Sequence, residues 1–205
     1  MKKVVLTGAN GFIGSALLNY LKKKNFKVKS LQRTRANNID IIKWEIGKNF
    51  PKKILDANIF IHCAYDNSQL SSNKSSIEND LNYIGLKKIL KQVRNKTKYK
   101  FIFISSQSAE KFSKSHYGKL KYRLEGILNY KHNKKVEITI RPGMVYARQK
   151  SYNTEFFKKL IKLRIFPIFS NKKNIQPIHI KDLCECIYKI IANKNEGEQV
   201  WDLLR

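Results

Sequence analysis

The segment Thr7-Gly8-Ala9-Asn10-Gly11-Phe12-Ile13-Gly14 follows a short apolar run at residues 3–7 and opens an amphipathic run at residues 12–24. The apolar run predicts a buried strand and the amphipathic run a helix, so the glycines lie in the turn between them. The first glycine permits a tight turn, the second lets the backbone approach a phosphate, and the third allows close helix-to-strand packing. Free N–H groups and the helix dipole favour an anion at this turn. The pattern therefore predicts dinucleotide binding.

Apolar and amphipathic runs alternate through the next part of the chain. The expected strands are residues 3–7, 27–32, 39–44, 58–63, 101–105 and 136–140. The expected helices between them are residues 12–24, 77–94 and 116–130. Such alternation predicts an α/β fold with a Rossmann-type, doubly wound parallel sheet, whose ligand lies beyond the carboxyl ends of the strands.

The remaining residues are less regular. We expect helices at 155–163 and 181–192, extended segments at 165–169 and 176–180, and a last strand at 200–203.

The composition describes one ordered domain with an unusual charge. The chain has 205 residues, 42% of them hydrophobic, with 42 Lys+Arg against 15 Asp+Glu and a net charge of +27. This excludes disordered, collagen-like and disulfide-rich classes. A large positive excess attracts polyanions. However, the basic residues occur in small clusters throughout the chain, which favours a background of lysine and arginine on a solvated surface.

The location and metal content follow from what the sequence lacks. Three cysteines are too few for a disulfide framework, and Cys184-x-Cys186 alone is a poor zinc signal, so we expect no metal. No run beyond the glycine turn approaches the ~20 apolar residues that span a bilayer. We therefore expect a cytoplasmic protein without a membrane span.

The end of the second strand bears on the choice of cofactor. NAD-binding proteins usually have Asp or Glu here to bind the ribose 2′-hydroxyl, whereas this chain has Gln32 followed by Arg33. A guanidinium can pair with a 2′-phosphate, which a carboxylate would repel. The sequence thus favours NADP over NAD.

A second motif suggests catalysis. Tyr117 and Lys121 are four residues apart and share one helix face. A nearby ammonium would lower the pKa of the tyrosine and make it a usable general acid or base. Ser106, at the end of the fifth strand, could hydrogen-bond the same substrate oxygen.

At this point the chain resembles the extended short-chain dehydrogenase/reductase superfamily, within it the NAD(P)-dependent epimerase/dehydratase family, which acts largely on nucleotide sugars. The segments that carry the resemblance are the glycine turn, Ile61-His62-Cys63-Ala64, Asn82 to Gly85, Phe103-Ile104-Ser105-Ser106, Tyr117-Gly118-Lys119-Leu120-Lys121, Arg141-Pro142-Gly143-Met144-Val145-Tyr146 and Ile178-His179-Ile180-Lys181-Asp182-Leu183.

The resemblance implies roles for individual residues. Tyr117 would be the acid/base, Lys121 would lower its pKa and bind the nicotinamide ribose, and Ser106 would polarise the substrate oxygen, with Ser108 as a substitute. The residues expected to bind the cofactor are Gly8, Asn10, Gly11, Phe12, Ile13, Gly14, Arg33, Cys63, Ala64, Asn82, Lys121, Pro142 and Val145. His62 is expected to be packed and not catalytic.

The resemblance also implies two regions and a reaction class. Residues 1–146 would form the NAD(P)-binding Rossmann domain, and residues 147–205 a reduced substrate-binding portion packed on it. The expected function is an NAD(P)-dependent reductase or epimerase acting on a nucleotide sugar or related carbonyl or hydroxyl substrate. This function is compatible with a homodimer.

Departures from the family pattern keep other functions open. Only eleven positions separate Ser106 from Tyr117, and Gln107 and Ser108 do not supply the acid/base pair typical of dehydratases. A non-catalytic NADP-binding regulator and a polyanion-binding protein remain alternatives, although we expect no specific nucleic-acid partner.

Overall fold

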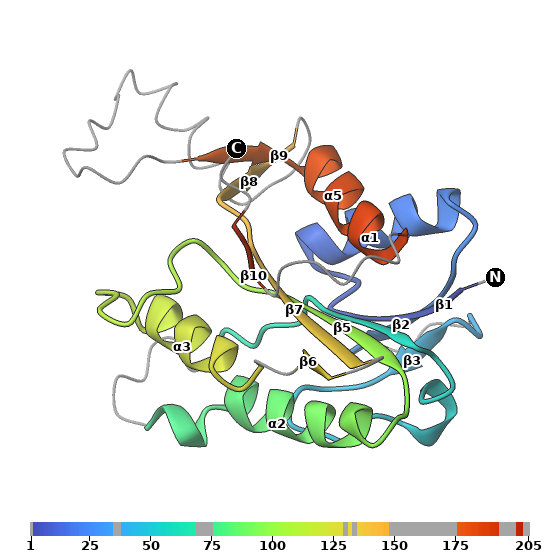
Figure 1. Ribbon diagram of the computed structural model, residues 1–205, viewed down its shortest axis with the longest axis horizontal. Helices are drawn as coiled ribbons and strands as arrows, with labels where there is room; N and C mark the ends of the chain where they lie inside the picture. Colours follow the sequence, from blue (N-terminus) through green and yellow to red (C-terminus); the bar gives the residue numbers. More distant parts are fainter. Residues whose placement is uncertain are drawn as a thin grey trace.

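A single parallel sheet forms the centre of the computed structural model, which describes residues 2–34, 38–68, 76–128, 131–132, 135–147, 176–192 and 200–202 (Figure 1). The strand order is β10-β7-β5-β4-β1-β2-β3, so the chain moves outward from β1 first to one edge and then to the other. The strands are β1 (Lys3–Thr7), β2 (Lys27–Gln32), β3 (Ile41–Lys43), β4 (Ile59–His62), β5 (Tyr99–Ile104), β7 (Lys135–Arg141) and β10 (Val200–Asp202). A short strand, β6 (Lys131–His132), pairs antiparallel with β7. This order confirms the predicted doubly wound sheet.

Helices cover both faces of the sheet. Helices α1 (Phe12–Lys23) and α5 (Ile180–Ala192) pack together on one face, and α2 (Leu81–Arg94) and α3 (His116–Glu125) lie on the other (Figure 1). A hydrophobic core lies on each face of the sheet, and alternate strand residues point into one core or the other. Val4 and Leu6 pack with α1, whereas Val5 packs with α2. Burial on both faces explains why the strands read as continuous apolar runs.

Two helices are shorter than predicted, α2 at its start and α3 at its end. Helix α2 begins after Asp80, whose carboxylate accepts a hydrogen bond from the backbone N–H of Asn82, and residues 77–79 form a separate 3₁₀ turn. Helix α3 begins after Ser115, whose hydroxyl accepts from the backbone N–H of Gly118. It ends at Glu125, so the prediction that it continues to residue 130 is wrong.

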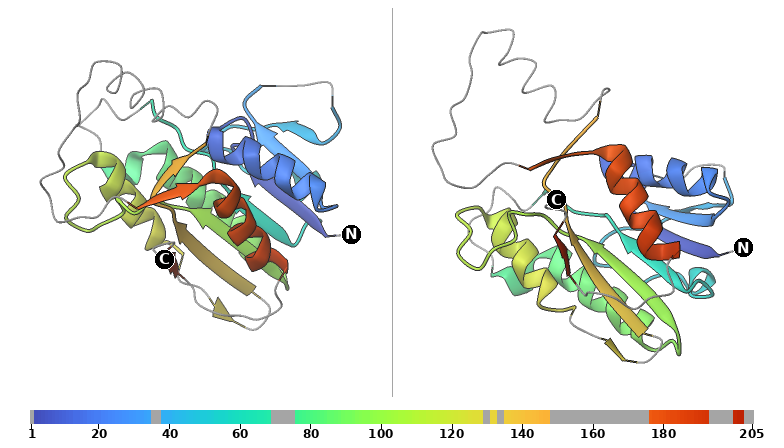
Figure 2. Two further views of the ribbon diagram at one scale, coloured as in Figure 1. Left: turned by 90° about the horizontal axis from the view of Figure 1, so that it is seen from above. Right: turned by 45° about the horizontal axis from the view of Figure 1, so that its top comes forward.

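A second, two-stranded parallel sheet joins β8 (Met144–Tyr146) to β9 (Pro177–His179). The prediction of an extended segment at 176–180 is confirmed for β9, whereas β8 was not predicted. Figure 2 shows these strands next to α5, above the main sheet. The predicted helix at 155–163 and extended segment at 165–169 lie outside the described residues, and the division after residue 146 stays a prediction.

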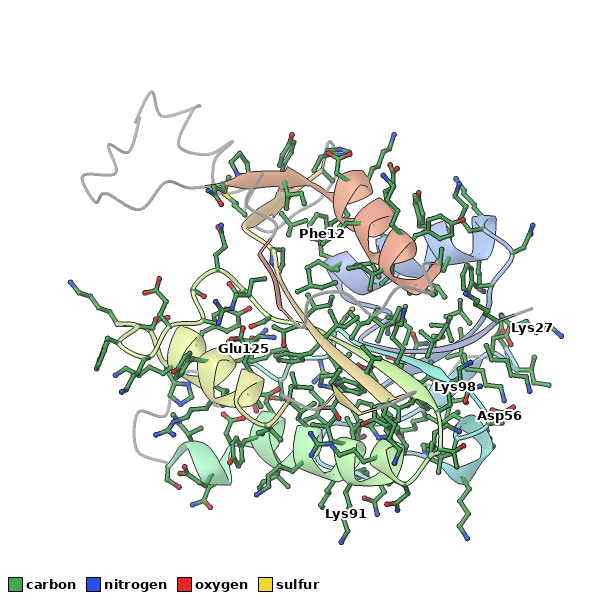
Figure 3. All side chains as sticks on the ribbon, viewed as in Figure 1. Phe12, Lys27, Asp56, Lys91, Lys98 and Glu125 are labelled. Carbon is green, nitrogen blue, oxygen red and sulfur yellow. The ribbon has the colours of Figure 1, made fainter. Side chains whose placement is uncertain are left out.

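The charged side chains of the described residues lie mostly on the outside of the two helical layers. Figure 3 shows Lys27, Lys91 and Lys98 on different parts of the surface, and all three are exposed. In the described part of the chain, no helix combines the length and apolarity that a membrane span requires.

Candidate active site

The glycine turn connects β1 to α1 through very close backbone contacts. Gly8 has a φ of +70°, and a Cβ on it would lie 2.7 Å from the backbone nitrogen of Ala64. A Cβ on Gly14 would overlap the carbonyl oxygen of Gly8. These two positions therefore require glycine for conformation and space, as the sequence predicted.

The N-terminus of α1 is ready to receive an anion. Its N-cap is Gly11, which has no side chain to satisfy the first N–H groups, and no acidic residue lies in the first turn. Asn10 and Gly11 are exposed, and Phe12 and Ile13 are half-buried. This cradle, which a Cβ would fill, fits the pyrophosphate of a dinucleotide.

The predicted cofactor-lining residues Cys63 and Ala64 follow β4 and touch this turn. The backbone N–H of Ala64 donates to Oγ1 of Thr7 at 3.2 Å, and Thr7 shares a 2.8 Å hydrogen bond with Nδ1 of His62. His62 is 4% exposed and stacks on Phe103. It is packed, as predicted.

Burial, together with the charge of Lys121, lowers the pKa of His62 from 6.5 to about 3. Below pH 6.5 the unfolded chain binds a proton that the folded chain does not, so stability falls as the pH drops. Between pH 7 and pH 5 this loss is about 2 kcal/mol. We expect His62→Asn, whose amide can still hydrogen-bond Thr7, to reduce the difference in unfolding free energy between these pH values by about that amount. Urea unfolding measures it, and an unchanged pH dependence would contradict the assignment.

Asn82 holds the segment that continues from Ala64. Its Oδ1 accepts from the backbone N–H of Asp66 at 2.8 Å, and its Nδ2 donates to the Asp66 carbonyl at 3.0 Å and to Asp80 at 2.9 Å. Asn82 is 4% exposed. It therefore fixes the backbone at Asp66, which continues from the cofactor-lining residues Cys63 and Ala64.

The three predicted catalytic residues meet beyond the carboxyl end of β5. Tyr117 and Lys121 come from α3, and the Lys121 Nζ lies 5.7 Å from the centre of the Tyr117 ring. Ser106 lies close enough to the Tyr117 hydroxyl to affect its pKa. Ser108, the proposed substitute, is exposed and lies 2.9 Å from Ser106 Oγ. The structure thus brings together Ser106, Tyr117 and Lys121.

Burial shifts the pKa values of Tyr117 and Lys121. It raises the pKa of Tyr117 above its ordinary value, while Ser106 partly opposes the rise. Lys121 directs its Nζ to the carbonyl oxygen of Ile104 at 2.8 Å. Burial lowers the pKa of Lys121 to about 8. The pKa of Tyr117 is therefore raised in this structure, and a lowering of it by Lys121 stays a prediction.

Glu125 anchors helix α3, a role that the sequence analysis missed. It accepts hydrogen bonds from Ser105 Oγ at 2.5 Å and from Arg141 Nε at 2.9 Å. Tyr117, Lys121 and Glu125 are spaced four residues apart, so this helix stripe could have been noticed in the sequence. The bonds fix α3 to the ends of β5 and β7.

Gln107 connects the Ser106 segment to the second sheet. Its backbone N–H donates to the carbonyl of Pro142 at 3.1 Å, and its side-chain Nε2 donates to Oε1 of Gln176. Pro142 is buried beside this segment, which is consistent with its predicted place near the site. Val145 lies in β8 and packs into the core with 8% exposure.

Arg33 follows β2 and is exposed. Hydrogen bonds from Ser68 lower the pKa of Asp66, and the charge of Arg33 adds a smaller lowering. The guanidinium therefore lies near the segment after β4. The glycine turn lies on the same side of the sheet, at the carboxyl ends of the strands.

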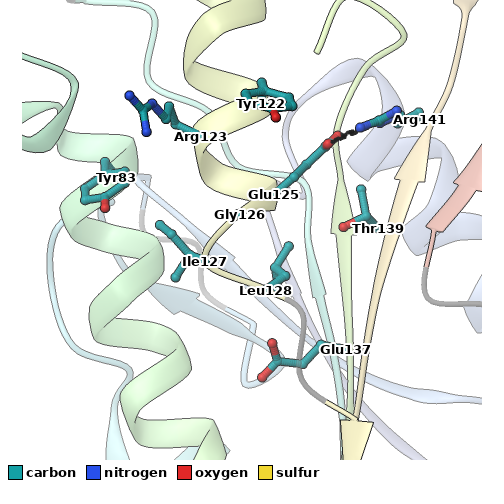
Figure 4. Close-up of a pocket in the computed structure, with 10 residues that line it drawn as sticks. All are labelled: Tyr83, Tyr122, Arg123, Glu125, Gly126, Ile127, Leu128, Glu137, Thr139 and Arg141. Atoms are coloured by element: carbon teal, nitrogen blue, oxygen red, sulfur yellow. Dashed lines mark hydrogen bonds and ion pairs between the residues drawn. The ribbon is translucent and has the colours of Figure 1, made fainter. Parts of the chain in front are cut away.

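A pocket of about 470 Å³ lies elsewhere, between α2, the end of α3 and β7 (Figure 4). Glu125 and Arg141 form an ion pair at this pocket, and Glu137 extends from β7. Glu137 also pairs with Arg94 at 2.7 Å. Neither the turn glycines nor Ser106, Tyr117 and Lys121 line this pocket, and its two carboxylates are neutralised. It therefore does not coincide with the candidate site.

Two further groups that the sequence singled out have ordinary surroundings. Cys184 is buried between α5 and the sheet, and His179 packs against Tyr146 with ring centres 5.3 Å apart. Within the described ranges, no three His, Cys, Asp or Glu side chains gather closely enough to hold a metal ion.

The comparison with known families agrees with this geometry. The model of the NAD dependent epimerase/dehydratase family matches residues 4–203. The chain belongs to this family. It carries a glycine turn and a Tyr-x-x-x-Lys helix on one Rossmann-type sheet.

Known relatives are distant but cover nearly the whole chain. UDP-glucose 4-epimerase of Vibrio cholerae is 24% identical over 230 residues, spanning 98% of this chain and 70% of that protein. UDP-glucuronic acid 4-epimerase of Bacillus cereus, solved with UDP-glucuronic acid and NAD, has a TM-score of 0.73 at 20% identity, covering 98% and 77% of the two chains. A human epimerase family protein solved with NADPH has a TM-score of 0.71 at 17% identity, covering 98% and 73%.

Proposed function

We propose that this protein is an NAD(P)-dependent epimerase or reductase that acts on a nucleotide sugar. One observation carries the proposal: Tyr117 lies beside Lys121 and Ser106, at the carboxyl ends of the strands where the glycine cradle also lies. Relatives solved with UDP-sugars and nicotinamide dinucleotides support the substrate class. The absence of an acid/base pair after Ser106 ranks a dehydratase below these two.

The protein's part in the reaction follows from the atoms present. A nicotinamide dinucleotide, when bound at the glycine turn, supplies hydride transfer to or from a substrate carbon. Ser106 Oγ donates a hydrogen bond to the substrate oxygen and orients it. Tyr117 Oη gives a proton to that oxygen when the carbon is reduced and takes it back when the carbon is oxidised. In this proposal Lys121 completes the proton-transfer group and binds the nicotinamide ribose.

The experiment that tests this function offers UDP-glucose or UDP-glucuronic acid to the purified protein with each nicotinamide dinucleotide. Proton NMR of the sugar detects an epimer, and absorbance of the reduced cofactor detects net oxidation or reduction. Cofactor-dependent conversion of either sugar supports the proposal. If the protein binds a nicotinamide dinucleotide but converts neither sugar nor a keto-sugar, a regulatory role takes its place.

For the cofactor, we propose a preference for NADP through Arg33. We expect Arg33→Ala to weaken NADPH binding about tenfold or more, because a charge-assisted hydrogen bond to the 2′-phosphate is lost. NADH binding should change little. Titration calorimetry with both nucleotides measures the difference.

The matched control is Lys27→Ala, which removes one exposed positive charge from the opposite end of the same strand. It separates a specific contact from the general attraction of a chain with net charge +27. An equal loss of affinity for NADPH in both variants would exclude the specific role of Arg33.

A further inference from the structure

The ammonium group of Lys121 is buried without an ion-pair partner among the described residues. Lys121 is 4% exposed. Its Nζ donates to one backbone carbonyl, that of Ile104, and no carboxylate of the described chain lies within 4 Å of it. The oxygens of Glu125, one helical turn away, are held by Ser105 and Arg141. A single carbonyl compensates poorly for burying a charge, so something else must stabilise the ammonium.

Aromatic rings provide that stabilisation. The Lys121 Nζ lies 4.7 Å from the centre of the Phe103 ring and 5.0 Å from that of Tyr65. The ring of Tyr117 is next, at 5.7 Å. All three distances fall within the ~6 Å range of cation–π attraction, which is strongest for a desolvated ammonium such as this one.

Tyr65 is held in this arrangement by its neighbours. Its ring meets Tyr117 edge to face, with centres 5.0 Å apart and an interplanar angle of 72°. The two hydrogen bonds between Asn82 and Asp66 fix the backbone that follows it. Tyr65 itself comes directly after Ala64, which contacts the glycine turn. The ring therefore bridges the cofactor-binding segment and the proton-transfer pair.

We propose that Tyr65, together with Phe103, forms an aromatic cage that keeps Lys121 charged and aimed at the Tyr117 phenol. Tyr65 is then a positioning residue that acts through Lys121. This role rests on the proposed function only in that Lys121 serves the proton transfer; the cage itself is a property of the folded protein.

Other groups around Lys121 contribute to its protonation and must be distinguished from the cage. Burial disfavours the charged form of Lys121, whereas Glu125, and Cys63 only where it is a thiolate, favour it. Burial raises the pKa of the Cys63 thiol to about 12, so this group is neutral near pH 8. His62 is neutral above a pKa of about 3. The phenols of Tyr65 and Tyr117 are also uncharged there, because burial raises the pKa of each.

The test observes Lys121 directly by NMR in protein labelled with ¹³C-lysine, so it needs no turnover. The pKa of Lys121 is lowered to about 8, and its signal should therefore titrate before those of exposed lysines. Lys121→Met, which removes the signal, assigns it. We expect Tyr65→Leu to lower the midpoint by about 0.5–1.5 pH units, because the cation–π attraction is lost.

Tyr65→Phe is the matched control, because it keeps the ring and removes only the hydroxyl; its midpoint should stay close to that of the wild type. Phe103→Leu should shift the midpoint in the same direction as Tyr65→Leu and serves if that variant does not fold. An unchanged midpoint in a folded Tyr65→Leu protein overturns the cage, whether or not the enzyme converts a sugar. Equal shifts in Tyr65→Leu and Tyr65→Phe also overturn it, since they would assign the effect to the hydroxyl.

Discussion

Tyr117→Phe should lower the turnover of a nucleotide sugar by about 10²–10⁴-fold, the usual contribution of a positioned general acid or base. The substitution removes only the Oη that exchanges the proton. The phenylalanine ring can still pack edge to face against Tyr65, so the fold around Lys121 should be kept. Turnover measured by sugar NMR should fall, while cofactor affinity measured by calorimetry should change little.

Tyr122→Phe is the control for this experiment. Tyr122 lies on the same helix, is exposed, and lines the separate pocket that Ser106, Tyr117 and Lys121 do not line. Its loss should leave turnover close to the wild-type value. If Tyr117→Phe retains full activity, Tyr117 is not the acid/base, whatever the sugar substrate proves to be.

The alternation of runs made most of the fold predictable. Buried parallel strands are apolar on both faces, and the chain carries such runs at nearly even spacing with amphipathic helices between them. The glycine turn was predictable for a similar reason: the positive φ of Gly8 and the contact of Gly14 with the Gly8 carbonyl leave little choice of residue. Strand β8 was not predictable, because it is short and pairs only with a distant segment.

The sequence predicted that Ser106, Tyr117 and Lys121 belong to one candidate site, but it did not predict the electrostatics of this group. A Tyr-x-x-x-Lys spacing places two side chains on one face, yet it does not reveal how deeply they are buried. Burial decides the result here, since it raises the pKa of Tyr117 and lowers that of Lys121. Tyr65 gave no signal at all, because its contacts with Lys121 come from a different strand end and appear only in three dimensions.

Two substitutions in the glycine turn should separate folding from cofactor binding. Gly14→Ala places a methyl group against the Gly8 carbonyl oxygen, where both partners are backbone and cannot move independently. We expect it to cost about 1–3 kcal/mol or more in unfolding free energy, as overpacking does, and to weaken nucleotide binding as well. Urea unfolding and calorimetric titration with NADH and NADPH measure the two effects.

Gly11→Ala differs in its surroundings and should differ in its result. A Cβ there would lie 3.2 Å from the Gly8 carbonyl oxygen, a tight contact that a small shift relieves, so the fold should be largely kept. The methyl group would nevertheless stand at the exposed N-cap of α1, where the pyrophosphate must approach the N–H groups. Losing even one such hydrogen bond should weaken binding about tenfold.

Gly126→Ala, whose Cβ would lie 3.4 Å from the Arg123 carbonyl oxygen, is the control and should change neither stability nor nucleotide binding greatly. Tight nucleotide binding by a folded Gly11→Ala protein would show that the pyrophosphate does not approach the helix at this residue.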